Sequence, residues 1–137
     1  MDWITDNIAI GNYLDARNEE LLSTQKIASI LSLDGGLAGI EPKKLGVRRI
    51  EIRKLHDGAE NHPEAFLSTL RVLHKLVLES PPVMVQCHAG RSRSIILVAG
   101  FLMMTHGLTS KQAIEQVASK REIGITPGIE KLLDYIV

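Results

Sequence analysis

The single cysteine of this 137-residue chain lies between a short apolar run and a long one. The four residues Val83–Gln86 are typical of a short buried strand, and the ten residues 95–104 are typical of a buried helix. Cys87 therefore opens a turn from a strand into a helix, whose free backbone N–H groups and positive dipole end face that turn. Such a turn favours an oxyanion, and Gly90 lets its backbone bend so that successive N–H groups face one point.

The spacing of the side chains on this turn points to phosphate chemistry. Five residues separate Cys87 from Arg93, so the loop can hold the thiol at its floor and the guanidinium at its rim. The field that attracts phosphate also favours the thiolate, which is the nucleophilic form of cysteine. Arg93 can bind two phosphate oxygens at once, and the Ser94 hydroxyl can donate to the sulfur as it attacks and as it leaves.

The run Cys-His-Ala-Gly-Arg-Ser-Arg-Ser at positions 87–94 resembles the signature loop of the cysteine-dependent protein phosphatases, specifically their small dual-specificity branch. That loop consists of cysteine, five residues, arginine, and serine or threonine. Residues 10–16, with Leu21 and residues 27–33, are also similar to the opening of these proteins. One position departs from the family, because Gln86 stands where a histidine usually precedes the cysteine.

The resemblance implies how each loop residue is used. Cys87 is the nucleophile that becomes a cysteinyl-phosphate, and Ser94 assists its departure. The phosphate is bound by the side chain of the arginine and by backbone N–H groups of the loop residues His88, Ala89, Gly90, Arg91, Ser92 and Arg93.

A phosphate ester also needs an acid that protonates the leaving oxygen, and Asp57 is the candidate. It lies in a polar loop after a predicted strand, thirty positions before Cys87 (87 minus 57). The resemblance implies a general acid about this far upstream, on a mobile loop. Glu60 in the same loop is the main rival, and Asp34, which also follows a predicted strand, is a weaker one.

The order of the predicted elements indicates one α/β domain over residues 1–137, with a small, mostly parallel central sheet flanked by helices. The predicted strands are Ile8–Gly11, at an edge of the sheet, 27–33, 47–52 and Val83–Gln86. The predicted helices are 15–24, Pro63–Glu79, 95–104, a segment capped by Thr109, and a last segment with Thr126 as its cap and Pro127 in its first turn. Residues 34–46 are expected to form a loop.

Composition narrows the possible partners and cofactors. Lys+Arg and Asp+Glu both total 16, and this zero net charge argues against general binding to nucleic acid or to a membrane surface. The longest apolar run is ten residues, too short to cross a bilayer, and no secretory signal is visible. A lone cysteine forms no intrachain disulfide, so we expect a reducing, cytoplasmic location. The five histidines show no metal-ligand spacing, and we expect neither a metal nor another cofactor.

These features together predict a metal-independent phosphoprotein phosphatase that acts on phosphotyrosine and also on phosphoserine and phosphothreonine. Its partners would be phosphorylated proteins or peptides, and phosphate and other oxyanions would inhibit it. Three alternatives stay open: a module that binds phosphate without turnover, a phosphatase for a lipid or an RNA 5′-phosphate, and a sulfur transferase. The intact Cys87, Arg93 and Asp57 argue against the first, and the residues 92–94 fit a phosphatase better than a sulfur transferase.

Overall fold

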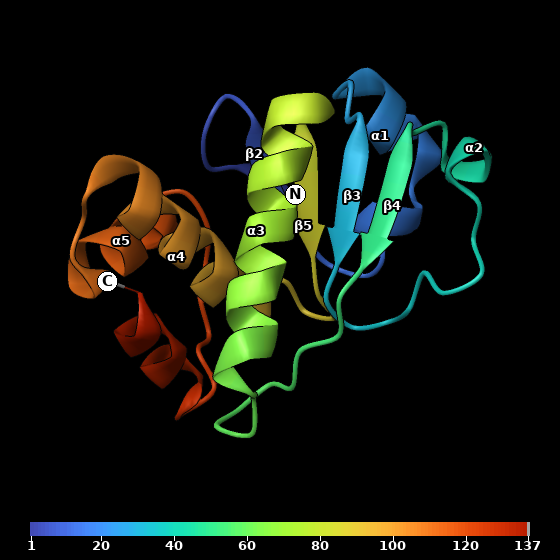
Figure 1. Ribbon diagram of the computed structural model, residues 1–137. Helices are drawn as coiled ribbons and strands as arrows, with labels where there is room; N and C mark the ends of the chain where they lie inside the picture. Colours follow the sequence, from blue (N-terminus) through green and yellow to red (C-terminus); the bar gives the residue numbers. More distant parts are fainter. Residues whose placement is uncertain (137) are drawn as a thin grey trace.

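A five-stranded sheet lies between two layers of helices in the computed structural model, which describes residues 1–136 (Figure 1). The strands are β1 (Asp2–Trp3), β2 (Ile8–Gly11), β3 (Ser29–Ser32), β4 (Arg49–Ile52) and β5 (Val83–Gln86). Their order is β1-β2-β5-β3-β4, and every pair is parallel except β1 with β2. The predicted α/β class with a small, mostly parallel sheet is therefore confirmed.

The register brings the carboxyl ends of four strands to one edge of the sheet. Gly11 and Ser32 both pair with Gln86, and Ser32 also pairs with Ile52. The four parallel strands thus end level with one another, and the segments that follow them meet at one edge.

The helices cover both faces of the sheet. They are the 3-10 helix η1 (Asp15–Arg17), α1 (Glu19–Thr24), α2 (Pro42–Leu45), α3 (Pro63–Glu79), α4 (Arg93–His106), α5 (Ser110–Ala118) and the 3-10 helix η2 (Ile129–Tyr135). Along β5, Val83 and Val85 pack into the hydrophobic cluster of α3, α4, α5 and η2, whereas Met84 packs into the cluster of α1 and α2. This alternation is what a strand covered on both faces requires.

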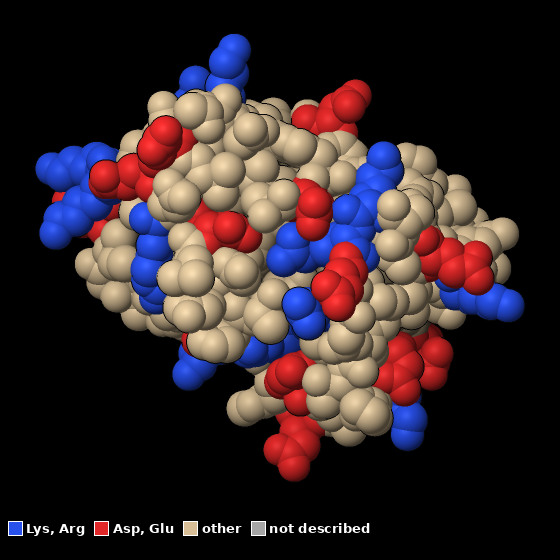
Figure 2. Space-filling view, turned by 180° about the vertical axis from the view of Figure 1, so that it is seen from behind, with Lys and Arg blue, Asp and Glu red and all other residues tan. Residues whose placement is uncertain are grey.

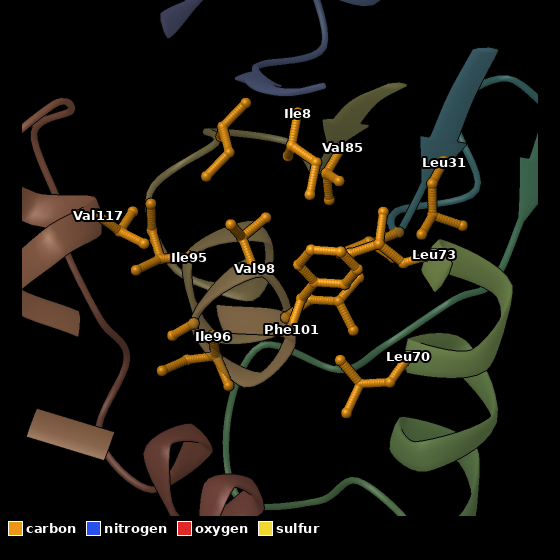
Figure 3. Close-up of a cluster of buried hydrophobic side chains, with 14 of the residues drawn as sticks. Ile8, Leu31, Leu70, Leu73, Val85, Ile95, Ile96, Val98, Phe101 and Val117 are labelled. Atoms are coloured by element: carbon orange, nitrogen blue, oxygen red, sulfur yellow. The ribbon is translucent and has the colours of Figure 1, made fainter. Parts of the chain in front are cut away.

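Helix α4 is buried all round because it lies between the sheet and three other helical elements. All nine residues from Ser94 to Leu102 are buried. Figure 3 shows this cluster, in which residues of α4 meet side chains of the strands, of α3 and of α5: Ile95, Ile96, Val98 and Phe101 with Ile8, Leu31, Val85, Leu70, Leu73 and Val117. The first eight residues of the ten-residue apolar run, 95–102, are thus the centre of the core, and Met104 at its end is exposed.

The observed starts of α3 and α5 agree with the predicted starts, whereas that of α4 differs. Helix α3 begins after His62, whose Nδ1 accepts from the N–H of Glu64, and α5 begins at the predicted cap Thr109. Helix α4 begins at Arg93, two residues before the predicted start, so Arg93 and Ser94 lie in its first turn. Both side chains are therefore held by a rigid element.

The structure corrects two predictions near the N-terminus. Strand β2 is not at the edge, because Asp2 pairs with Ile10 and Trp3 with Ala9; a two-residue strand is too short to show a pattern. The predicted helix 15–24 is two elements, because the side chain of Asn18 accepts from the N–H of Leu21 and begins a new helix there.

Two further predictions are wrong in loop regions. The segment 34–46 contains the short helix α2, which begins at Pro42 and ends at Gly46 with a φ of 72°. The last helical segment begins after Gly128, with a φ of 100°, and not at Thr126 and Pro127. Thr126 does not cap it; its N–H donates instead to Ser92 Oγ at 3.0 Å.

The charged side chains on the surface include both signs, as the equal numbers of basic and acidic residues predict (Figure 2). Figure 2 shows basic and acidic side chains interspersed over the face opposite to that of Figure 1. Within the described residues no single helix is long and apolar enough to cross a membrane; α4 and α5 reach that length and hydropathy only together, across a bend of 120°.

Helix α3 offers a matched test of the core. Leu73 is fully buried and Leu78, on the same helix, is 83% exposed. We expect Leu73→Ala to lower the free energy of unfolding by about 2–5 kcal/mol, because a cavity replaces the lost side chain. Leu78→Ala should change it by less than about 0.5 kcal/mol. Urea unfolding checks both, and equal losses would contradict the packing described here.

Candidate active site

Three of the four residues predicted to be catalytic, Cys87, Arg93 and Asp57, meet in one pocket at the carboxyl edge of the sheet, whereas Ser94 and the loop residue Gly90 do not line it. Its volume is about 290 Å³, and it is lined by Asp57, Cys87, His88, Ala89, Arg91, Ser92, Arg93 and Gly124. Glu60 and Asp34, the two rivals of Asp57, are not among these lining residues. A larger hollow of about 380 Å³ between α5 and η2 is lined by Ser110 and by lysines, carboxylates and apolar side chains, and it contains none of the residues predicted to be catalytic.

The backbone of the loop turns its carbonyl groups away from the pocket's centre. The carbonyl of His88 accepts from the N–H of Tyr13 at 3.0 Å, and that of Arg91 accepts from the N–H of Gly124 at 2.9 Å. The carbonyl of Gly90 accepts from the side chain of Arg121 at 2.6 Å. Among the described residues no N–H group from 88 to 92 donates to a protein acceptor, so these donors are available to an anion.

Arg121 and Gly90 explain why the loop keeps this shape. Arg121 Nη1 donates to Asp2 Oδ2 at 2.9 Å and to the carbonyl of Ile10 at 3.2 Å, while its Nε holds Gly90. Gly90 has a φ of 67°, and a Cβ there would lie 2.6 Å from Arg121 Nη2 and 2.8 Å from the carbonyl oxygen of Gly11. Only glycine fits this position without displacing its neighbours.

Next to the buried Cys87, the first turn of α4 contributes two buried polar atoms that lack protein partners within residues 1–136. Cys87 is 2% exposed and lies at the floor of the pocket. Arg93 Nε and Ser94 Oγ are buried and have no protein hydrogen-bond partner among the described residues. Buried polar atoms usually have partners, so Arg93 Nε is available to a ligand oxygen in the pocket, and Ser94 Oγ is available to a further donor or acceptor. Arg93 Nη1 donates to the carbonyl of Leu55 at 3.2 Å, which ties it to the loop that carries Asp57.

Asp57 lies on a short loop that is closed by one asparagine. Asn61 Oδ1 accepts from the N–H of His56 at 2.8 Å, and its Nδ2 donates to the carbonyls of His56 and Gly58 at 2.6 and 3.1 Å. Asp57 therefore lies on a closed turn, exposed to solvent at the lip of the pocket. The carboxyl group is thus placed above the loop that would bind phosphate.

Asp34 does not line the pocket and instead accepts hydrogen bonds from neighbouring groups. Its carboxylate accepts from Gln86 Nε2 and from the N–H of Gly36, both at 2.9 Å, and Ser32 Oγ lies 3.2 Å from it. Burial by itself raises the pKa of this carboxyl. The hydrogen bonds from these three groups, with the nearby charge of Arg93, outweigh burial and hold the pKa of Asp34 below its ordinary value. Asp34 is therefore a fixed anion and a poor proton donor.

Gln86 completes this network under the cysteine. Its side chain is fully buried, and its Oε1 accepts from Ser32 Oγ at 2.6 Å while its Nε2 donates to Asp34. The residue that departs from the family pattern thus has both ends of its amide satisfied. The end of β5, and with it the start of the loop, is fixed to β3 through side chains as well as through the backbone.

Three contributors to this site carry no signal in the sequence. Tyr13 and Arg121 hold the loop from segments far away along the chain, and Asn61 closes its turn through contacts within a polar loop. None of them belongs to a motif with chemistry of its own, so only the folded chain identifies them. Residues 1–136 contain no group of three or more His, Cys, Asp or Glu side chains arranged to hold a metal ion.

Comparison with known proteins gives consistent matches. Residues 8–135 match the family model "Dual specificity phosphatase, catalytic domain". The chain is 30% identical to dual specificity protein phosphatase 22 of Homo sapiens over 121 residues, which cover 88% of this chain and 64% of that protein. It is 26% identical to dual specificity protein phosphatase 1 of Arabidopsis thaliana over 120 residues, 88% of this chain and 60% of that protein. The chain thus spans less than two thirds of the length of these relatives.

Solved structures share the fold. Human DUSP28 superposes with a TM-score of 0.82 at 22% identity, covering 98% of this chain and 93% of that one. The human tyrosine phosphatase-like serine/threonine/tyrosine-interacting protein gives a TM-score of 0.81 at 24% identity, with the same coverage.

The network of Asp34 predicts a pH-dependent contribution to stability. Because its pKa is lower in the folded chain, the carboxylate stabilises the fold at neutral pH, and this stabilisation is lost as the pH falls through the folded pKa. Asp34→Asn should therefore lower the free energy of unfolding at pH 7 by about 1–3 kcal/mol. The difference from wild type should shrink below about pH 4. Urea unfolding across pH measures it, with Asp6→Asn, at an exposed position, as the control. A difference that is constant with pH would contradict this assignment.

Proposed function

This chain belongs to the dual-specificity phosphatase family, as its signature loop indicated, and on that premise we propose that it hydrolyses phosphoproteins through a cysteinyl-phosphate intermediate. One observation carries the proposal. In the loop between β5 and α4, three carbonyls accept hydrogen bonds from protein donors, the N–H groups of residues 88–92 have no protein acceptor among the described residues, and Cys87 lies in the pocket that the loop lines. This arrangement suits a phosphate dianion above a thiolate.

In the first step, the phosphate of the substrate binds to the N–H groups of residues 88–93 and to the guanidinium of Arg93. The Cys87 thiolate attacks phosphorus, so the S–P bond forms as the bond from phosphorus to the ester oxygen breaks. Asp57, at the lip of the pocket, gives its proton to the departing oxygen. The backbone donors and Arg93 stabilise the charge on the equatorial oxygens, so the scheme needs no metal.

In the second step, a water molecule attacks the cysteinyl-phosphate. Asp57, now a carboxylate, takes the proton of that water, and the S–P bond breaks to release phosphate. Ser94 lies in the first turn of α4 with its Oγ buried and without a protein partner, so it can donate to the sulfur as the thiolate departs. Because free phosphate binds to the same donors, phosphate and other oxyanions should compete with substrate.

The shape of the pocket supports a substrate range that includes phosphotyrosine, phosphoserine and phosphothreonine. Its volume is about 290 Å³, and its lining consists mainly of the loop itself. Arg91, the second arginine of the loop, is 54% exposed and pairs with Glu122 at 3.4 Å. That pairing turns its charge toward the rim, which favours a phosphoprotein over a lipid with several phosphate groups.

The nucleophile is tested with p-nitrophenyl phosphate in the presence of a chelator. Wild type should retain its rate, and Cys87→Ser should abolish turnover while still binding tungstate, because the backbone donors remain. Full activity in Cys87→Ser would contradict the mechanism. A wild type that binds tungstate but never turns over would instead identify a module that binds phosphate without catalysis.

The general acid is tested with leaving groups of different quality. Asp57→Asn should lower kcat by about 10²–10⁴-fold on phenyl phosphate, and less on p-nitrophenyl phosphate, whose leaving group needs little protonation. Glu60→Gln is the matched control, since Glu60 belongs to the same loop but does not line the pocket. A rate unchanged in Asp57→Asn and lost in Glu60→Gln would move the role to Glu60.

A further inference from the structure

An aromatic stack borders the pocket on the side of the first loop residue. The rings of Tyr13 and His88 are parallel within 3°, with centroids 4.4 Å apart. The N–H of Tyr13 donates to the carbonyl of His88 at 3.0 Å, which joins the two backbones beside the rings. Tyr13 follows β2 and His88 follows Cys87, so the neighbouring strands β2 and β5 supply one ring each.

Arg17 contacts the Tyr13 ring of this stack. Its guanidinium lies over the ring of Tyr13, with Cζ 5.9 Å from the centroid, and donates to the carbonyls of Tyr13 and Gly36, both at 2.7 Å. His88 lines the pocket, whereas Tyr13 is not among the lining residues. His88 therefore joins Tyr13 to the phosphate pocket.

Both rings are accessible to a partner. His88 is exposed, and Tyr13 is 38% exposed. Two aromatic side chains that are already fixed against each other lose little conformational freedom when a third group packs on them. The mechanism above uses only the backbone of His88, so both side chains are free for another role.

We propose that the Tyr13–His88 stack is a subsite for the aromatic ring of a phosphotyrosine substrate, and that it favours phosphotyrosine over phosphothreonine and phosphoserine. The inference rests on the proposed function, whose phosphate site it extends. A phosphate bound above Cys87 places the ester oxygen at the mouth of the loop, next to His88. A phenyl ring attached to that oxygen meets the imidazole, whereas the short aliphatic chain of phosphothreonine has no flat surface to offer.

The test compares two peptides that are identical except for phosphotyrosine or phosphothreonine at one position. His88→Ala should lower kcat/KM for the phosphotyrosine peptide by about three- to tenfold, the size of one aromatic contact. The value for the phosphothreonine peptide should fall by a smaller factor, so that the ratio of the two values decreases, because both peptides use the same phosphate donors and only phosphotyrosine has a ring to lose contact with the imidazole. Tyr13→Ala should act in the same direction, because it removes the support of His88.

Variants that keep the rings separate this role from a structural one. His88→Phe and Tyr13→Phe should retain the ratio of the two kcat/KM values, because a flat ring remains at each position. Tyr135→Ala is the matched control, since it removes the other tyrosine of the chain, which is 52% exposed and does not line the pocket. It should leave both values unchanged.

The outcomes distinguish the two proposals. Equal losses on both peptides in His88→Ala, or no loss on either, would overturn the subsite while leaving the phosphatase intact. A wild type that hydrolyses neither peptide nor p-nitrophenyl phosphate would overturn the proposed function and the subsite with it. A selective loss on phosphotyrosine, restored in His88→Phe, would establish the stack as a determinant of specificity.

Discussion

A loop that gathers its N–H groups around one point must turn its carbonyls outward, and each of those carbonyls then needs a donor of its own. In this chain the donors come from Tyr13, after β2, and from Arg121 and Gly124, after α5. The same guanidinium that holds Gly90 also holds β1 and β2, so the sheet edge and the loop are fixed together. Tyr13, Arg121 and Gly124 thus form a frame for the residues between Cys87 and Arg93.

The centre of the fold could be predicted because its signals are local. The apolar runs of β5 and α4, with the spacing of Cys87 and Arg93 between them, identify the loop from consecutive residues. The side-chain contacts that hold the loop and the strand end before it could not be predicted, because they join residues far apart in the sequence. Arg121 donates to Gly90, 31 positions away, and Gln86 donates to Asp34, 52 positions away. Near the C-terminus, Thr126 is a residue type that often caps a helix, but its N–H donates to Ser92 Oγ. The last helical segment begins after Gly128 instead.

The sequence ranks Asp57 above Glu60 and Asp34 by position along the chain, but it does not show what surrounds each carboxyl group. Asp57 and Asp34 both lie at the carboxyl edge, and residue type alone gives them the same chemistry. The difference arises from their donors: three groups hold Asp34 as an anion away from the pocket, whereas Asp57 is exposed at its lip. Glu60 lies in the same loop as Asp57 but outside the lining. Surroundings, and not residue identity, decide which carboxyl group can exchange a proton with a substrate.

The network of Ser32, Asp34 and Gln86 also limits which side chains can stand directly before the cysteine. Gln86 is fully buried and uses its donor and its acceptor at the same time, so an apolar replacement removes one hydrogen bond from Ser32 and one from Asp34. A side chain that replaces Gln86 without this loss must present an acceptor to Ser32 and a donor to Asp34. Position 86 is therefore coupled to positions 32 and 34, and the tolerance for a substitution at one of them depends on the residues at the other two.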